Sequence, residues 1–283
     1  MLMLDVSHLS KTYGSGSGAF TAIGDISLSV VAGELVCIVG PSGCGKTTML
    51  RCLAGLLPPT SGAVSLDAQP VTRPPRQMAV VFQDYSRSLL PWLDVVGNVT
   101  LPLKAAGVRK PRRLALAGDA LAAVGLAEHA HKYPWQLSGG MQQRAAIARA
   151  LAYQPEILLM DEPFASVDAQ TRAELEDLLL DVWTRFDITI LLVTHDIDEA
   201  VYLADRVVLL SGAPAIVTES LTVDLPRPRD QIATKEMPEF AHLRAHVFAA
   251  VKAAGDQARR DAASEASAPD AAAGVAVGPD AAA

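Results

Sequence analysis

A run of glycine, lysine and threonine residues gives this sequence its clearest chemical signal. Residues 40–48 fit the phosphate-binding pattern G-x-x-x-x-G-K-[ST]. Glycines let backbone N–H groups turn inward around phosphate oxygens, because no Cβ blocks them. Lys46 adds a charge that can reach the β- and γ-phosphates, and the Thr47 hydroxyl suits Mg²⁺. We predict an ATP site made by Gly40, Pro41, Ser42, Gly43, Cys44, Gly45, Lys46, Thr47 and Thr48.

The segments on either side of this loop are the ones the pattern requires. Residues 34–39 form an apolar strand, and apolar residues recur at helical spacing over 49–57. A strand, a glycine loop and a helix together point the positive end of the helix at the phosphates. The alternative is a glycine-rich turn that matches by chance, and the flanking pattern disfavours it.

Two adjacent carboxylates provide the second signal. Asp161 and Glu162 directly follow the apolar strand 157–160, at the strand end where ligands bind in open α/β sheets. Successive strand residues point to opposite sides, so the two carboxylates should have different roles. We expect Asp161 to bind Mg²⁺ and Glu162 to polarise a water for attack on the γ-phosphate. A solvated acidic turn is the alternative, which the preceding phosphate loop makes less attractive.

A second anion site is predicted at Ser138, Gly139 and Gly140, where a helix begins. A helix start offers free N–H groups, and serine adds a hydroxyl. One nucleotide does not need two such helix ends from one chain. The simplest arrangement is a head-to-tail dimer, in which this segment covers the ATP held by the Lys46 loop of the other copy. An ordinary helix cap is the alternative.

Four single residues complete the candidate site. Gln83 ends a strand and is placed to reach Mg²⁺ and the attacking water, and His195 ends another strand, where its imidazole can hold the γ-phosphate. Tyr13 is a candidate for stacking on adenine. Asp168 follows Glu162 closely and can couple two sites across a dimer or cap a helix. The alternatives are a solvated amide, a structural histidine and a half-buried aromatic.

Composition limits the classes of protein that fit. The chain has 283 residues, of which 50% are hydrophobic, and no apolar run reaches the roughly 18–20 residues that span a bilayer. Its net charge of −7 argues against a broad nucleic-acid surface. Cys37, Cys44 and Cys52 show no metal-ligand spacing, which favours a reduced, cytosolic setting.

The apolar pattern also predicts the architecture. Apolar segments at 157–160, 188–193 and 207–210 are separated by helical patterns, as in a parallel sheet covered on both faces. Residues 2–32 alternate as edge β-structure, with Leu4, Val6 and His8 on one face. A helical insertion is expected at about 85–153. Beyond Asp256 the chain is mostly Ala, Gly, Asp, Ser and Pro, so we expect residues 256–283 to be a disordered tail.

Taken in order, these motifs resemble the ATP-binding cassette (ABC) ATPases over about residues 3–250. The Ser-Gly-Gly segment combined with a phosphate loop is highly specific to that family. Met141 stands where the wider family often has Gln, and Ser166-Val167-Asp168 replaces the commoner Ser-Ala-Leu-Asp. Segments 82–84, 90–92, 133–137 and 224–230 resemble the nitrate/sulfonate/taurine importer branch, which also includes bicarbonate transporters.

The resemblance implies an α/β fold: a RecA-like P-loop NTPase core with an antiparallel β-subdomain and an inserted α-helical subdomain, within an ATP-binding domain at 1–255. It implies an ATPase with ATP and Mg²⁺ held in a homodimer, which drives an integral membrane permease served by an extracytoplasmic solute-binding protein. The chain would lie peripherally on the cytoplasmic face of the inner membrane, without nucleic acid. The segment Leu89-Leu90-Pro91-Trp92-Leu93 would then face the permease or lie in the subdomain core.

Other functions remain open at this point. A soluble ABC ATPase acting on DNA, ribosomes or Fe–S assembly would usually show a basic surface, two cassettes or long coiled-coil inserts. A nucleotide switch without catalysis need not retain Glu162 and His195. An exporter cassette is often fused to membrane helices.

Overall fold

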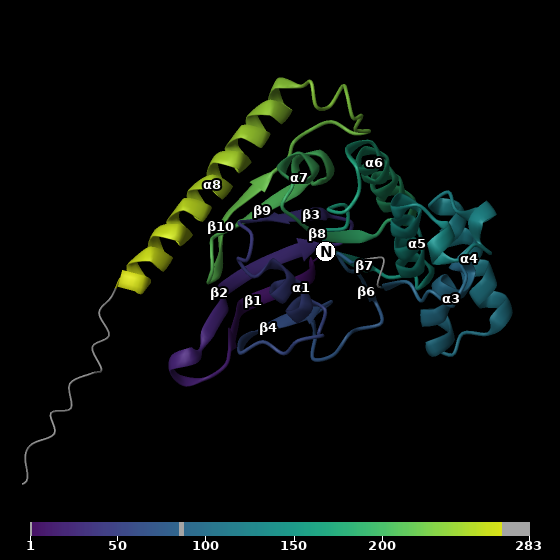
Figure 1. The fold of residues 1–283 in the computed structure, drawn as a ribbon, viewed down its shortest axis with the longest axis horizontal. Helices are drawn as coiled ribbons and strands as arrows, with labels where there is room; N and C mark the ends of the chain where they lie inside the picture. The colour runs from purple at the N-terminus through teal and green to yellow at the C-terminus, as the bar shows by residue number, and fades with distance from the viewer. Residues whose placement is uncertain (1, 85–87, 268–283) are drawn as a thin grey trace, which may run out of the picture.

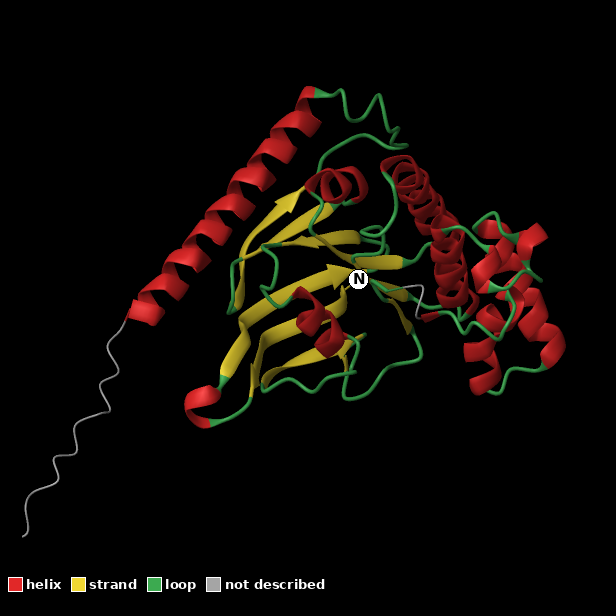
Figure 2. Ribbon diagram, in the orientation of Figure 1, coloured by secondary structure: helices red, strands yellow, loops and turns green. Residues whose placement is uncertain are grey.

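The computed structural model describes residues 2–84 and 88–267, which form an α/β fold around one curled sheet (Figures 1 and 2). The strands of the sheet are β1 (Leu2–Tyr13), β2 (Phe20–Val31), β3 (Leu35–Val39), β4 (Ser61–Leu66), β5 (Gln69–Pro70), β6 (Met78–Val81), β7 (Ile157–Asp161), β8 (Thr189–Thr194), β9 (Arg206–Leu210) and β10 (Ala215–Thr222). The main helices are α1 (Lys46–Leu53), α3 (Val95–Ala105), α4 (Lys110–Ala123), α5 (Gly139–Ala152), α6 (Ala169–Phe186), α7 (Ile197–Leu203) and α8 (Pro238–Ser267).

One half of the sheet is parallel. The strand order is β5-β4-β1-β2-β10-β9-β3-β8-β7-β6, and β9, β3, β8, β7 and β6 pair in parallel with their neighbours in that run. Every residue of β3, β7 and β8 is buried, as expected for strands covered on both faces. Their carboxyl ends lie at one edge, so the loops after β3, β6, β7 and β8 converge there.

The other half of the sheet is antiparallel except where β10 pairs with β2 in parallel, and it contains one departure from the sequence prediction. Strand β1 pairs with β2 and β4, and its register shifts between Val6 and Leu9. His8 is exposed there with a φ of 50°. The expected alternation Leu4–Val6–His8 is therefore wrong at its last position. The extra residue of a β-bulge puts Leu9, which is fully buried, on the core face instead.

Helices α3, α4 and α5 form an arm on one side of the sheet (Figure 1). Apolar residues such as Val99, Leu121 and Ile147 are buried between them. Asn98 is also buried, and its side chain bonds the backbone of Leu90 and Leu93. This fixes the segment that enters the arm. None of the helices among the described residues is both long and apolar enough to cross a membrane.

The C-terminal part of the described chain forms one long helix, α8. It packs against α7 and β9 and runs along one side of the body (Figure 2). Residues 256–267, which the composition predicted to be disordered, form its last turns. The prediction of a tail from 256 is wrong for these residues, because alanine is a strong helix former and the helix start is anchored by packing. The rest of the expected tail, 268–283, lies outside the described residues.

Candidate nucleotide site

The predicted phosphate loop joins β3 to α1 and has the backbone that its glycines permit. Gly43 and Gly45 have φ values of 77° and 106°, in the left-handed region that favours glycine. A Cβ on Gly45 would lie 2.7 Å from the carbonyl oxygen of Ala22. Any larger residue would therefore push the loop off the neighbouring strand β2.

Lys46 lies on the first turn of α1, folded back over the loop. Its Nζ donates hydrogen bonds to the carbonyl oxygens of Gly40 and Pro41, at 2.8 and 3.1 Å. The residue is 6% exposed, so the ammonium group is held at the loop rather than in solvent. This places a positive charge at the cradle predicted to hold phosphates.

Thr47 and Asp161 lie side by side, although 114 residues separate them in sequence. The Thr47 hydroxyl donates to Oδ1 of Asp161 at 3.2 Å. Burial raises the pKa of the Asp161 carboxyl, and the hydrogen bond from Thr47 opposes that shift. A hydroxyl and a carboxylate are hard oxygen donors of the kind Mg²⁺ prefers. Among the described residues no cluster of three or more His, Cys, Asp or Glu side chains forms a self-contained metal site. The pair therefore fits a Mg²⁺ whose other ligands come from phosphate and water.

Three of the predicted catalytic residues meet at one atom. Oε2 of Glu162 accepts a hydrogen bond from Nε2 of Gln83 and lies 3.0 Å from Nδ1 of His195. Glu162 follows β7 with a φ of 44°, and its N–H bonds the carbonyl oxygen of Val193 on β8. A non-glycine residue in this region is strained, and such strain is concentrated at functional sites.

Tyr13 lies beside the last residue of the predicted phosphate-binding segment. Its hydroxyl is 3.3 Å from Oγ1 of Thr48, and the residue is 39% exposed. Phe20 is its direct partner across β1 and β2. Two exposed aromatic residues therefore face each other across β1 and β2 near Thr48, and either offers a ring on which a base could stack.

Cys44 closes a turn within the phosphate loop. Its N–H bonds the carbonyl oxygen of Pro41 at 3.3 Å, which closes a turn within the loop. The residue is 1% exposed. Burial raises the pKa of its thiol, while the charge of Lys46 opposes the shift. The thiol therefore belongs to the core.

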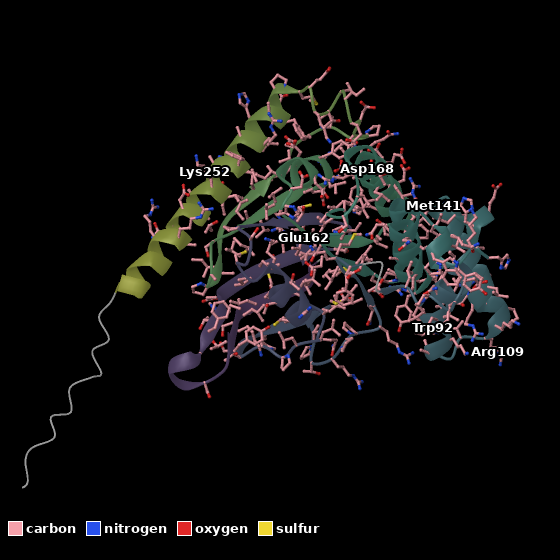
Figure 3. The ribbon with its side chains drawn as sticks, viewed as in Figure 1. Trp92, Arg109, Met141, Glu162, Asp168 and Lys252 are labelled. Atoms are coloured by element: carbon pink, nitrogen blue, oxygen red, sulfur yellow. The ribbon has the colours of Figure 1, made fainter. Side chains whose placement is uncertain are left out.

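The helix start that we predict as a second anion site is formed, and it lies apart from the phosphate loop. Ser138 caps α5 and accepts a hydrogen bond at Oγ from the N–H of Met141. In the described part of the chain no hydrogen bond joins residues 138–140 to residues 40–48. Figure 3 shows Met141 on the helical arm, away from Glu162 at the sheet edge. A single chain thus does not bring the two anion sites together.

Asp168 caps helix α6. Its carboxylate accepts from the N–H and the hydroxyl of Thr171, at 2.9 and 2.8 Å. These hydrogen bonds hold the pKa of the Asp168 carboxyl below its usual value. The side chain is exposed, so the cap is formed while one side of the carboxylate faces solvent.

One ion pair beside this site has no counterpart in the sequence patterns. Arg172 on α6 donates to Asp196 at 2.6 Å, and Asp196 directly follows His195. The contact ties the start of α6 to the loop that holds the histidine. A pair separated by 24 residues leaves no local pattern, and only the packing of α6 on α7 reveals it.

Comparison with known proteins decides the family. The ABC transporter family model matches residues 23–165. The chain belongs to the ABC transporter family. It is therefore an ATP-hydrolysing transporter component, and the fold expectation is confirmed.

Three relatives are similar over most of their length. The chain is 46% identical to a nitrate import ATP-binding protein of Synechococcus elongatus, over 83% of this chain and 86% of that protein. It is 45% identical to a taurine import ATP-binding protein of Yersinia pseudotuberculosis, covering 88% and 97%. It is 43% identical to a bicarbonate transport ATP-binding protein of Synechocystis, covering 85% and 86%.

A solved structure extends the likeness to the fold. A dimeric ATP-binding cassette in a post-hydrolysis state, bound to ADP and Pi, is 32% identical with a TM-score of 0.67. The match covers 78% of this chain and 99% of that one. The resemblance to ABC ATPases of importer type is confirmed by these comparisons.

Proposed function

We propose that this chain is the ATPase subunit of an importer for a small, anionic solute of the nitrate, sulfonate or taurine type. The observation that carries the hydrolytic part is the meeting of Gln83 and His195 at Oε2 of Glu162, beside the phosphate loop. The direction of transport and the solute class rest on the names of the relatives, which import nitrate and taurine and transport bicarbonate.

In the proposed site, each residue has one task. Residues 40–48 bind the phosphates of ATP, and Tyr13 stacks on adenine. Thr47 and Asp161 would hold Mg²⁺, which would neutralise charge on the phosphates, and the Gln83 amide would orient the attacking water. Glu162 accepts a proton from that water as it attacks the γ-phosphorus, and the bond to the β-phosphate oxygen breaks, leaving ADP and phosphate.

The ATP-bound form is proposed to be a head-to-tail homodimer. Its support is the separation of Ser138–Gly140 from the phosphate loop within one chain, together with the dimeric state of a cassette of the same fold. Ser138, Gly139 and Gly140 of one copy would cover the γ-phosphate held by the other. Asp168, exposed at the start of α6, would then couple the two sites.

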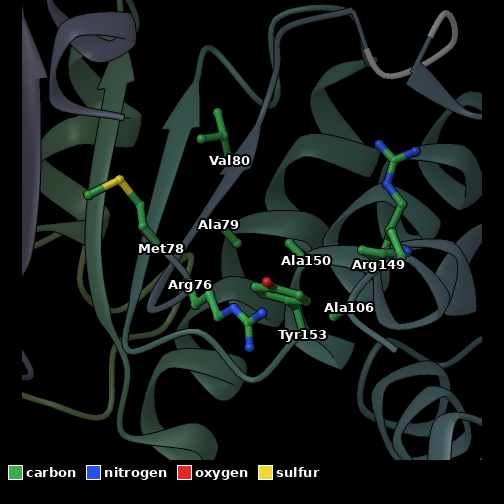
Figure 4. A pocket seen from close by; sticks show the side chains of 10 residues that line it. Arg76, Met78, Ala79, Val80, Ala106, Arg149, Ala150 and Tyr153 are labelled. Atoms are coloured by element: carbon green, nitrogen blue, oxygen red, sulfur yellow. The ribbon is translucent and has the colours of Figure 1, made fainter. Parts of the chain in front are cut away.

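The permease is proposed to dock on the helical arm. Of the segment 89–93, Leu89 is buried but Trp92 is 69% exposed, and Figure 3 shows Trp92 on the helical arm. A hollow of about 490 Å³ lies between edge strand β6 and helices α3 and α5 (Figure 4). Met78, Ala106 and Tyr153 give it an apolar lining, and Arg149 lies at its side. An exposed tryptophan on the arm and an apolar hollow lined in part by the arm helices are each suited to a short amphipathic segment of a membrane protein.

Pull-down from membranes tests this assignment. A tagged Glu162→Gln chain, extracted from native membranes with ATP, should co-purify with a multi-span permease, and the solute-binding protein encoded beside it can then be screened for its solute. Adding Trp92→Ala should release the permease. Ile232→Ala, which removes a side chain on a residue that is 70% exposed outside the arm, is the matched control. Recovery only with ribosomes, nucleic acid or no partner would instead favour a non-transport ABC ATPase.

A further inference from the structure

Helix α8 runs past both ends of the candidate nucleotide site. Near its start, Arg244 and Phe248 line a hollow together with His195. Further along, Lys252 and Arg259 line another hollow together with Ser42 and residues beside it in the phosphate loop. These four α8 residues are spaced by four or seven positions and fall on one side of the helix. One helix face therefore follows the site from its histidine to its phosphate loop.

Helix α8 packs closely against the loops that border the second hollow. A Cβ on Gly212 would lie 2.2 Å from Cβ of Ala258, and a Cβ on Gly255 would lie 3.9 Å from Cγ of Pro41. The end of α8 thus rests on the loop after β9 and against the first half of the phosphate loop. Ala254 is part of the same contact, with its carbonyl oxygen 3.5 Å from that Gly212 position.

The same hollow reaches the aromatic end of the site. Phe20 lines it, and Phe20 is the cross-strand partner of Tyr13, whose hydroxyl lies beside Thr48. The volume is about 910 Å³, within the range of ligand-binding clefts. A nucleotide on the phosphate loop with its base at Tyr13 would therefore lie alongside this stretch of α8.

The charges on this stretch suit an anionic ligand. Lys252 and Arg259 line the hollow with one opposing carboxylate, Asp256. Among the described side chains, neither cation takes part in an ion pair. In a chain with a net charge of −7, two unpaired cations beside a phosphate loop are matched to the charge of a nucleoside triphosphate.

We propose that Lys252 and Arg259 of α8 form an outer wall of the nucleotide site and bind the anionic part of ATP held on residues 40–48. This rests on the proposed assignment of the phosphate loop as the ATP site. The C-terminal helix is then a part of the binding site and not only an appendage of the core.

Binding of a non-hydrolysable ATP analogue with Mg²⁺ to the isolated full chain, measured by calorimetry, tests this. Lys252→Ala/Arg259→Ala should raise Kd by about threefold to tenfold, as expected for two partly exposed charge contacts. The increase should shrink at high salt. Lys110→Ala/Arg260→Ala removes the same charge at exposed positions outside the hollow, and its Kd should stay within about twofold of wild type.

A charge-neutral pair of variants tests the packing. Gly212→Ala places a methyl against Ala258 and should displace the end of α8, which raises Kd without changing any charge. Adding Ala258→Gly removes the clash and should restore binding, while Ala258→Gly alone serves as the control. Failure of this rescue, with Kd raised equally in the single and double variants, would contradict the proposed wall.

The variant data distinguish the proposed role of α8 from the assignment of the phosphate loop as the ATP site. If Lys46→Ala abolishes binding while Lys252→Ala/Arg259→Ala binds like its control, or more tightly, α8 is not part of the site and the inference falls alone. If Lys46→Ala binds as wild type does, the phosphate-loop assignment falls, and the inference falls with it.

Discussion

Nδ1 of His195 lies 3.0 Å from Oε2 of Glu162, which constrains what the other ring nitrogen can do. If Nδ1 donates to the carboxylate, Nε2 of a neutral imidazole is an acceptor. It can donate to a phosphate oxygen only when the ring is protonated or when the contact with Glu162 breaks. Gln83 bonds the same oxygen, so arrival of nucleotide and water must rearrange this group.

His195→Ala removes the donor proposed for the γ-phosphate. We expect kcat for ATP hydrolysis to fall by about 10²-fold, as when one transition-state donor is lost, with little change in ATP affinity. His8→Ala is the control, because His8 is an exposed histidine paired with the carboxylate of Asp25, and neither residue belongs to the proposed site. Equal ATPase rates in the two variants would remove His195 from the mechanism.

Asp161 should make the Mg²⁺ requirement depend on pH. Burial raises the pKa of this carboxyl, so protons compete with Mg²⁺ for its oxygens at less acidic pH than at an ordinary aspartate. The Mg²⁺ concentration for half-maximal ATPase should therefore rise as the pH falls from about 8 to about 5. Asp161→Asn should lose Mg²⁺-dependent hydrolysis. A Mg²⁺ titration that is independent of pH and unchanged in this variant would contradict the assignment.

Variants of Asp168 can separate its role as the cap of helix α6 from its proposed role in coupling the two nucleotide sites of a dimer. Hydrogen bonds from Thr171 hold the pKa of Asp168 below its unfolded value, so its contribution to stability is present above the unfolded pKa and is lost as pH falls through the folded pKa. Asparagine retains the cap without the charge. Asp168→Asn should melt near the wild-type temperature at neutral pH but hydrolyse ATP more slowly, whereas Asp168→Ala should also melt earlier. Wild-type turnover in the asparagine variant would leave the residue as a cap only.

The cysteines should resist alkylation in the folded protein. The sequence motif places Cys44 in the nucleotide pocket, which predicts that a thiol reagent blocks ATP binding. The structure predicts the reverse, because Cys37, Cys44 and Cys52 are all buried and burial raises the pKa of each thiol. Little thiolate forms in mildly alkaline buffer. Mass spectrometry should show slow labelling of the native chain and full labelling in urea. Fast native labelling of Cys44 would contradict its position.

The sequence predicted best those features that depend on strand ends. Gln83, Glu162 and His195 each follow an apolar strand, so their meeting at one sheet edge follows from parallel topology. The bulge at His8 was missed because a positive φ at a non-glycine residue leaves no mark in an alternating pattern. The end of α8 was missed because its alanine-rich composition is shared by disordered tails and helices. The contact between the end of α8 and Gly212 is a tertiary contact that no local pattern encodes.

The mass of the Glu162→Gln chain in the presence of MgATP, measured by light scattering, tests the central claim of shared sites most directly. Loss of the general base should slow turnover by about 10²- to 10⁴-fold while ATP stays bound. The mass should then double from the 29.8 kDa of one chain, and Ser138→Arg in the same background should prevent doubling without abolishing ATP binding. A chain that binds ATP and remains at 29.8 kDa, or one that dimerises equally well with Ser138→Arg, would contradict the head-to-tail arrangement.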